Sequence, residues 1–114
     1  MNHSTAVLII KALDGLAARS VATAENIANA GTPGYRPLRV SFEDALKAAA
    51  AQGDDAVRQL TFKAEPAPVE ESNGEVRLDR ELATASTTAM RYGALIDIFD
   101  RRLEMDTLAT RGGS

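Results

Sequence analysis

Apolar residues recur along the first third of the chain at alternating intervals of four and three. This spacing places them on one side of an α-helix and is typical of helices that pack side by side. Val7, Leu16 and Val21 widen the stripe along one edge. The pattern predicts a helix over residues 4–30, about 37 Å long at 1.5 Å per residue. Its seam consists of Ala6, Ile10, Leu13, Ala17, Ser20, Ala24 and Ile27, of which only Ser20 is polar.

The same period returns near the carboxyl end, where no polar residue interrupts it. It predicts a second long helix over residues 80–111. A second line of residues, Leu95, Ile98, Arg102 and Met105, runs beside the main seam. The main seam consists of Leu82, Ala85, Ala89, Tyr92, Ile96, Phe99 and Leu103.

Residues 31–79 separate the two predicted helices and begin with a marked stop. Gly31 can adopt the left-handed conformation that often follows a helix end. Thr32-Pro33-Gly34-Tyr35 has the composition of a type II turn, because proline fixes φ at the second position and glycine accepts a positive φ at the third. The chain is therefore expected to reverse direction here.

A short helix is expected from Phe42 to about Gln52, with Ser41 as its N-cap. Residues 54–79 contain several prolines and glycines, which break regular structure. We expect them to form a poorly ordered loop, in which residues 59–63 form at most a brief strand.

These elements predict a mainly α-helical single domain, residues 1–114, whose long N- and C-terminal helices pack as a coiled-coil-like pair. Each helix can bury one seam in that contact, at about 1.5–3 kcal/mol per well-buried Leu or Ile side chain. The second line and the widened edge are then left facing water. Apolar faces of this kind indicate association with other helices. The alternative is a closed three- or four-helix bundle, in which the middle segment covers these faces.

Composition excludes several kinds of chemistry. The net charge of −3 argues against a nucleic-acid binder that relies on a basic face. The chain has no cysteine, which excludes disulfides and thiolate chemistry, and its one histidine, His3, makes a histidine-based metal site unexpected. The apolar run from Ala6 to Ile10 is too short to span a membrane and lacks the features of a cleaved secretory signal.

No arrangement of residues indicates catalysis. The acidic pairs at 43–44, 54–55 and 70–71 are adjacent in sequence, unlike the spaced carboxylates that divide acid and base roles. No phosphate-binding loop, dinucleotide fingerprint or nucleophile elbow is present in the sequence. We therefore expect a protein that is not an enzyme and has no cofactor, metal or small-molecule substrate.

The most specific motif of the chain lies at the end of the first predicted helix. Two asparagines three residues apart share one helix face, where their amides could bind loop carbonyls, contact a neighbouring chain or cap the helix end. The motif resembles the amino-terminal signature of the bacterial flagellar axial proteins, the family of rod, hook and hook-associated proteins. The residues that carry the resemblance are Asn26, Ile27, Ala28, Asn29, Thr32, Pro33, Gly34 and Tyr35.

Three further segments, residues 40–46, 73–81 and 89–92, make the chain similar to the short rod members of that family, which lack the large inserts of hook proteins. The resemblance covers residues 8–47 and 73–113. The sequence departs from the family pattern at Gly31, where Asp is usual, at Thr88, where Asn is usual, and at Gly93, where Gln is common.

The resemblance implies a structural subunit of the flagellar basal body. Its terminal helices would pack against those of neighbouring subunits to form the periplasm-spanning rod, which transmits torque. It also implies export through the flagellar type III apparatus without a cleaved signal. The implied partners are copies of the chain itself, other rod proteins, and the membrane-ring and rod-adaptor proteins at the rod base.

The residues alone are also compatible with two other functions. A helical adaptor or export chaperone would bind a client helix in a groove and form a discrete small oligomer. A small hydrolase would use the acidic pairs.

Overall fold

The structure is a computed structural model that describes residues 1–112, so Gly113 and Ser114 lie outside the described residues. It is mainly helical, and its long N- and C-terminal helices pack together as the sequence predicts. The elements follow in the order α1 (His3–Ala28), β1 (Leu38–Arg39), α2 (Glu43–Gln52), α3 (Asp54–Gln59), β2 (Glu65–Pro66), α4 (Val69–Ser72) and α5 (Leu78–Gly112).

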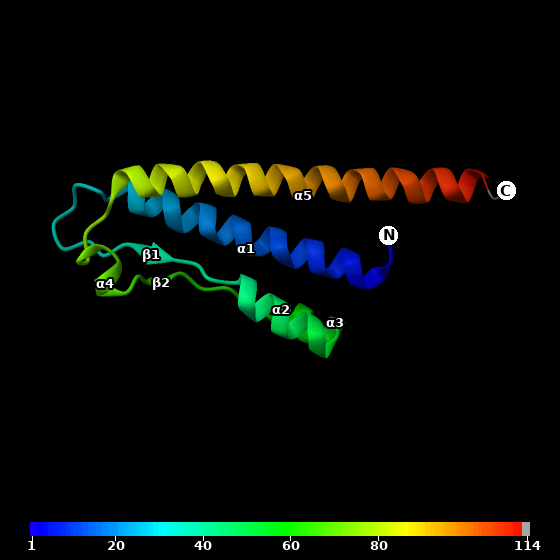
Figure 1. Ribbon diagram of the computed structural model, residues 1–114, viewed down its shortest axis with the longest axis horizontal. Coiled ribbons are helices and arrows are strands. Elements are labelled where there is room, and N and C mark those ends of the chain that lie inside the picture. The colour runs from blue at the N-terminus through cyan, green and yellow to red at the C-terminus, as the bar shows by residue number, and fades with distance from the viewer. Residues whose placement is uncertain (113–114) are drawn as a thin grey trace.

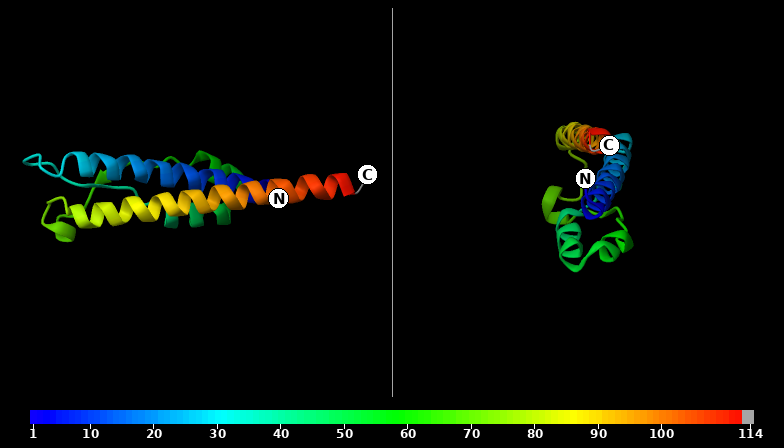
Figure 2. Two further views of the ribbon diagram at one scale, coloured as in Figure 1. Left: turned by 90° about the horizontal axis from the view of Figure 1, so that it is seen from above. Right: turned by 90° about the vertical axis from the view of Figure 1, so that its right-hand side faces the viewer.

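Helix α1 lies in the middle of an elongated molecule. Figure 1 shows α5 along one side of α1 and the middle segment, from β1 to α4, along the other, and the end-on view of Figure 2 shows the same order. The molecule measures 64 × 27 × 15 Å and has a radius of gyration of 17.5 Å, whereas a compact domain of this length has about 13 Å. Within the described residues, the backbone of α5 lies close to that of α1 and of no other helix or strand, while its side chains also reach the middle segment, as in the ion pair between Arg91 and Glu43 at 3.7 Å.

The hydrophobic core lies between α1 and the middle segment. Strand β1 pairs antiparallel with β2, with Leu38 opposite Pro66 and Arg39 opposite Glu65. This two-stranded ribbon and helices α2 and α3 cover one side of α1. The buried residues of the core are Leu16, Ala22, Val40, Phe42, Leu46, Ala49 and Val57.

Gly15 allows the closest contact in this core. A Cβ atom at this position would lie 2.5 Å from Cγ of Phe42, a separation that real Cβ atoms essentially never show. The ring of Phe42 therefore lies directly on the backbone of α1, and it also packs against Phe62 with 5.3 Å between the ring centroids. Glycine lowers helix stability by about 1 kcal/mol relative to alanine, and here this cost is offset by the packing of a large aromatic side chain.

The turn after α1 agrees with the sequence in part. The backbone N–H of Tyr35 donates to the carbonyl of Thr32, and Gly34 has a φ of +78°, as a type II turn requires. Gly31, however, is not among the residues with positive φ. The helix ends instead at Asn29, whose N–H and side-chain amide both donate to the carbonyl of Glu25.

The middle segment contains more regular structure than the sequence predicts. Residues 54–79 include α3, β2 and α4, and the brief strand expected over residues 59–63 is wrong, because the strand that pairs with β1 is β2. Ser41 is not the N-cap of the short helix; that position is held by Phe42, without a side-chain hydrogen bond. Val57, at 3% exposure, explains the ordering of α3, since this side chain belongs to the core.

The widened edge of the first helix was expected to face water, and this is wrong for Leu16. Leu16 is only 3% exposed, and Val7 packs against the core, whereas Val21 is 61% exposed. In the second line of α5, Leu95 packs against the core and Ile98 and Met105 are exposed. The physical reason is that α1 packs against α5 on one side and against the middle segment on another. The middle segment therefore covers part of the widened edge of α1, which would stay exposed if only the two long helices were paired.

Candidate assembly site

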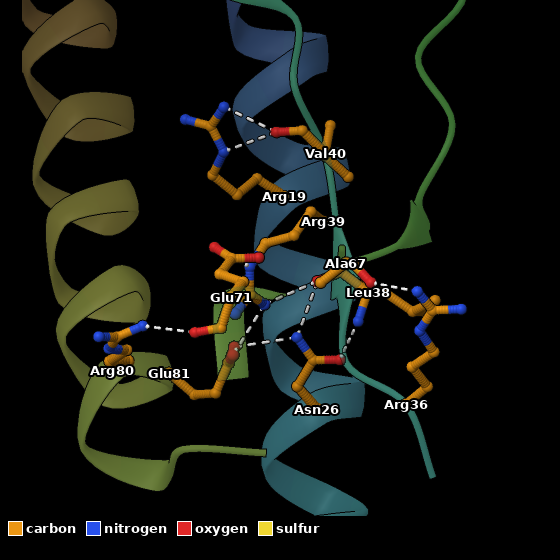
Figure 3. A network of polar contacts seen from close by, with 10 residues as sticks. All are labelled: Arg19, Asn26, Arg36, Leu38, Arg39, Val40, Ala67, Glu71, Arg80 and Glu81. Atoms are coloured by element: carbon orange, nitrogen blue, oxygen red, sulfur yellow. Dashed lines mark hydrogen bonds and ion pairs between the residues drawn. The ribbon is translucent and has the colours of Figure 1, made fainter. Parts of the chain in front are cut away.

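The side chain of Asn26 joins α1, β1 and α5 at one buried point (Figure 3). It is 0% exposed. Its Oδ1 accepts hydrogen bonds from the backbone N–H of Leu38 at 2.8 Å and from the hydroxyl of Tyr35 at 2.9 Å. Its Nδ2 donates to the carbonyl of Leu38 and to Oε2 of Glu81, both at 2.9 Å. The amide therefore acts toward Leu38 as a neighbouring strand would, since it pairs with both the N–H and the C=O group.

Helix α5 contributes Glu81, which accepts a hydrogen bond from Asn26 at this buried position. Its side chain is 1% exposed, and its second oxygen accepts a hydrogen bond from Nη1 of Arg39 at 2.8 Å. Arg39 also donates to the carbonyl of Leu38 and lies near the carboxylate of Glu71. A buried carboxylate is tolerated only when it is paired in this way. We call the set Asn26, Tyr35, Leu38, Arg39 and Glu81 the Asn26 junction.

The turn motif supplies the remaining partner of Asn26. Burial and the nearby carboxylates of Glu25 and Glu81 raise the pKa of Tyr35, so its hydroxyl keeps the proton that it donates to Asn26. Asn29 makes only local contacts, to the carbonyl of Glu25 and from the hydroxyl of Thr32. The two asparagines of the motif thus differ in role: one joins three segments, and the other ends a helix.

Arg19 fixes the other end of β1 to α1. Its guanidinium donates to the carbonyl of Val40 and, through both terminal nitrogens, to the carboxylate of Glu43 at 2.9 and 2.7 Å. Its Cζ atom also lies 4.7 Å from the ring centroid of Phe42. Side-chain hydrogen bonds from Arg19, with further backbone hydrogen bonds, lower the pKa of Glu43 to about 2. Neither Arg19 nor Glu43 carries a local sequence signal of this pairing.

The expectation that each long helix buries its seam in the contact between them is wrong, because none of the predicted seam residues is buried in the single chain. Leu13, Ile27, Ala85 and Phe99 are half-buried. The exposed members are Ile10, Ala17, Ala24, Leu82, Ala89, Tyr92, Ile96 and Leu103, with 50% exposure for Ile10, 54% for Leu82 and 45% for Leu103.

The seams of the two helices meet on one side of the molecule. Residues of both line one groove of about 420 Å³ between α1 and α5. The core lies on another side of α1, against the middle segment. We call this exposed surface, formed by the seam residues of α1 and α5, the seam face. The groove is lined by Leu16, Ala17, Ser20, Thr88, Ala89, Tyr92 and Gly93.

The most buried residues that α5 contributes to its contact with α1 are polar, whereas its seam residues are apolar. The two fully buried residues of α5 within residues 78–112 are Glu81 and Thr88. Leu82 and Ile96 on the same helix remain exposed. The hydrogen bonds of the Asn26 junction hold Glu81 toward α1, and in this orientation Leu82 and Ile96 stay outside while Leu95 packs against the core.

Other candidate chemistry is not found in the described part of the chain. Residues 1–112 contain no group of three His, Asp or Glu side chains that could hold a metal ion. No helix in this range has the length and hydropathy that a membrane span needs. No protein-family model matches the chain, and no curated protein is significantly similar to it.

The Asn26 junction predicts a large difference between two similar substitutions. Asn26→Ala leaves the N–H and C=O of Leu38 and one oxygen of Glu81 without their partner, so we expect a loss of about 3 kcal/mol in the free energy of unfolding. Asn29→Ala removes only local hydrogen bonds at the carboxyl end of α1 and should cost about 0.5–1.5 kcal/mol. Urea denaturation followed by circular dichroism measures both. Equal losses for the two variants would contradict the assigned roles.

The Arg19–Glu43 pair predicts a defined pH dependence. Because the folded-state pKa of Glu43 is about 2 against an ordinary value of 4.5, its stabilising effect is complete above about pH 4.5 and is lost as the pH falls toward 2. Glu43→Gln should therefore be less stable than the parent at neutral pH, with a difference that shrinks over this acid range. Urea midpoints against pH test this, with Glu104→Gln on the exposed end of α5 as the control. A difference that stays constant with pH would contradict it.

Proposed function

We propose that this chain is a structural subunit that assembles with other helical subunits through its seam face. The observation that carries the proposal is the exposure of Ile10, Leu82 and Leu103 along one side of two paired helices, 50%, 54% and 45% respectively. Exposed apolar side chains gathered on one face mark interaction sites, because monomeric proteins rarely leave large apolar patches uncovered. Covering the exposed half of each large side chain adds about 1 kcal/mol to association, so a contact along the length of both helices is favourable.

The class of assembly that we propose is the bacterial flagellar axial structure. The proposal rests on the resemblance of residues 26–35 to the signature of that family, and the Asn26 junction gives the motif a physical role. Asn26 binds both backbone groups of Leu38, so it cannot be exchanged for another residue without loss of hydrogen bonds. Pro33 and Gly34 form the turn that brings Tyr35 back to it.

Within that class, the shortness of the chain and the segments at 40–46, 73–81 and 89–92 resemble the proximal rod protein FlgB. We propose the corresponding role, a subunit near the base of the rod that links the membrane ring to the distal rod and transmits torque. Its partners would be copies of itself, other rod proteins, the membrane-ring and rod-adaptor proteins, and the type III export apparatus. Glu81, the last residue of segment 73–81, accepts a hydrogen bond from Asn26, which gives this segment too a structural role.

Substitutions on the seam face test the proposal. Ile96→Asp and Leu103→Asp place a carboxylate on the exposed surface, outside the core, so the helical content should be retained. Burying that charge in a contact between subunits costs about 2–4 kcal/mol, which weakens association at least about thirtyfold. Sedimentation velocity over a range of concentrations measures association, and circular dichroism measures folding.

Thr61→Asp provides the control, because Thr61 is exposed on the middle segment, away from the seam face. It should leave association unchanged. A parent chain that stays monomeric at all concentrations would overturn the proposal. A parent that forms one discrete small oligomer would instead favour a helical adaptor or export chaperone.

A further inference from the structure

A second apolar hollow, which we call the trough, lies between α1, α2 and α5 and has a volume of about 490 Å³. It lies on another side of α1 from the seam face, because the nine residues between Leu8 and Ala17 correspond to about 180° around the helix axis. A helix placed in the trough would bury apolar surface against three helices at once. The apolar lining includes Leu8, Ala12, Leu46, Ala50 and Leu95.

The apolar surface of the trough is incompletely covered in the single chain. Leu8 is 37% exposed, although it lies between α2 and α5. Along α5 the same surface continues past Leu95 to Ile98, which is 45% exposed. Arg91 of α5 and Glu43 of α2 lie 3.7 Å apart and bridge the two walls at one end. The trough therefore extends from this ion pair toward the amino end of α1.

The rim of the trough carries positive charge. Lys47 belongs to the lining on α2 and is exposed. Arg102 follows Leu95 by seven residues, which places it on the same side of α5 two turns further on. Within residues 1–112, neither Lys47 nor Arg102 makes a hydrogen bond or an ion pair. Arg91 is 58% exposed and has Glu43 as its partner.

The carboxylates around the trough do not cancel this charge. Glu43 is already held by both terminal nitrogens of Arg19. Asp54 accepts a hydrogen bond from the hydroxyl of Ser4, and Asp106 pairs with the amino terminus. Over the length of the trough, the other carboxylates of the three helices lie at least about 120° around their axes from Leu8, Ala50 and Leu95. They are Asp14, Asp44, Asp97, Asp100 and Glu104.

We propose that the trough binds an amphipathic helix of a different protein, whose apolar stripe is flanked by aspartate or glutamate. The stripe covers Leu8, Leu95 and Ile98, and the flanking carboxylates meet Lys47 and Arg102 at the rim. Copies that join through the seam face leave the trough open, so the choice of a different protein rests on the proposed function. The acidic character of the bound helix rests on the charges of the rim alone.

A pair of synthetic peptides tests the trough in the full chain. The acidic peptide is helical, with leucine at alternating intervals of three and four residues and glutamate at the flanking positions. The basic peptide has lysine at each glutamate position. Fluorescence anisotropy of the labelled peptides at low salt should show at least about tenfold tighter binding of the acidic one, with a difference that shrinks as salt is added. Equal binding of the two peptides, or no binding of the acidic one, would overturn the inference.

A matched pair of substitutions on α2 locates the binding. Ala50→Trp fills the trough and should abolish binding of the acidic peptide. Ala48→Trp is the control, because Ala48 is exposed like Ala50 but lies about 160° around α2 from it. It should leave binding unchanged, and circular dichroism checks that both variants fold. Equal effects of the two variants would contradict the site.

A second pair tests the rim without changing its shape. Lys47→Glu should reduce the preference for the acidic peptide by about threefold or more. Lys63→Glu changes the net charge equally on an exposed position of the middle segment outside the trough, and should keep the preference of the parent chain. An equal reduction in both variants would show an effect of net charge alone and would overturn the inference.

Sedimentation velocity separates this inference from the proposed function. Ile96→Asp, on the seam face, should weaken association of the chain with itself and leave peptide binding unchanged. If Ala50→Trp weakens self-association and Ala48→Trp does not, a second copy occupies the trough, and the inference fails while the proposed function stands. If the parent chain does not associate at all, the proposed function fails, and the peptides still decide whether the trough binds an acidic helix.

Discussion

The backbone of helix α5 runs along α1 alone, and the exposure of its apolar residues depends on this arrangement. In a 35-residue helix, one packed side leaves most of the surface to the solvent, and along α5 that surface carries leucine, isoleucine and methionine. Helix α1 is different, because the middle segment covers a second side of it with a hydrophobic core. The molecule is thus a small folded unit, α1 with the middle segment, to which a long and incompletely covered helix is attached.

The attachment is made by polar groups whose geometry is specific. Asn26, Glu81 and Arg39 satisfy one another in a buried position, and hydrogen bonds of this kind work only in one register. Apolar packing alone would leave the rotation of α5 poorly fixed, because the helix carries large apolar residues on several sides. The junction prevents this rotation, so the most apolar stripe of α5 remains available to other helices. The hydrogen bonds of the Asn26 junction, which hold α5 to α1, therefore also determine which side of α5 stays exposed.

The sequence predicts the long helices well because periodicity over many turns is a strong signal, and it predicts the turn at 32–35 because proline and glycine fix its geometry. It fails for α3 and β2, whose few residues are ordered by contacts such as that of Val57 with the core. It also fails to show which face of each helix is inside. Hydrophobicity ranks Leu82 and Ile96 above Glu81 and Thr88, yet the buried positions belong to the polar pair. Arg19 and Glu43, 24 residues apart, gave no signal in the sequence.

Amide hydrogen exchange along α5, compared between dilute and associated protein, tests the central claim most directly. Helix amides that lack packed neighbours open readily, and new contacts slow their exchange. We expect fast exchange over residues 96–112 in dilute solution, strong slowing on association, and little change in α2 and α3. Slow exchange of these α5 amides in the dilute monomer would contradict it, because α5 would then need no second molecule to complete its packing.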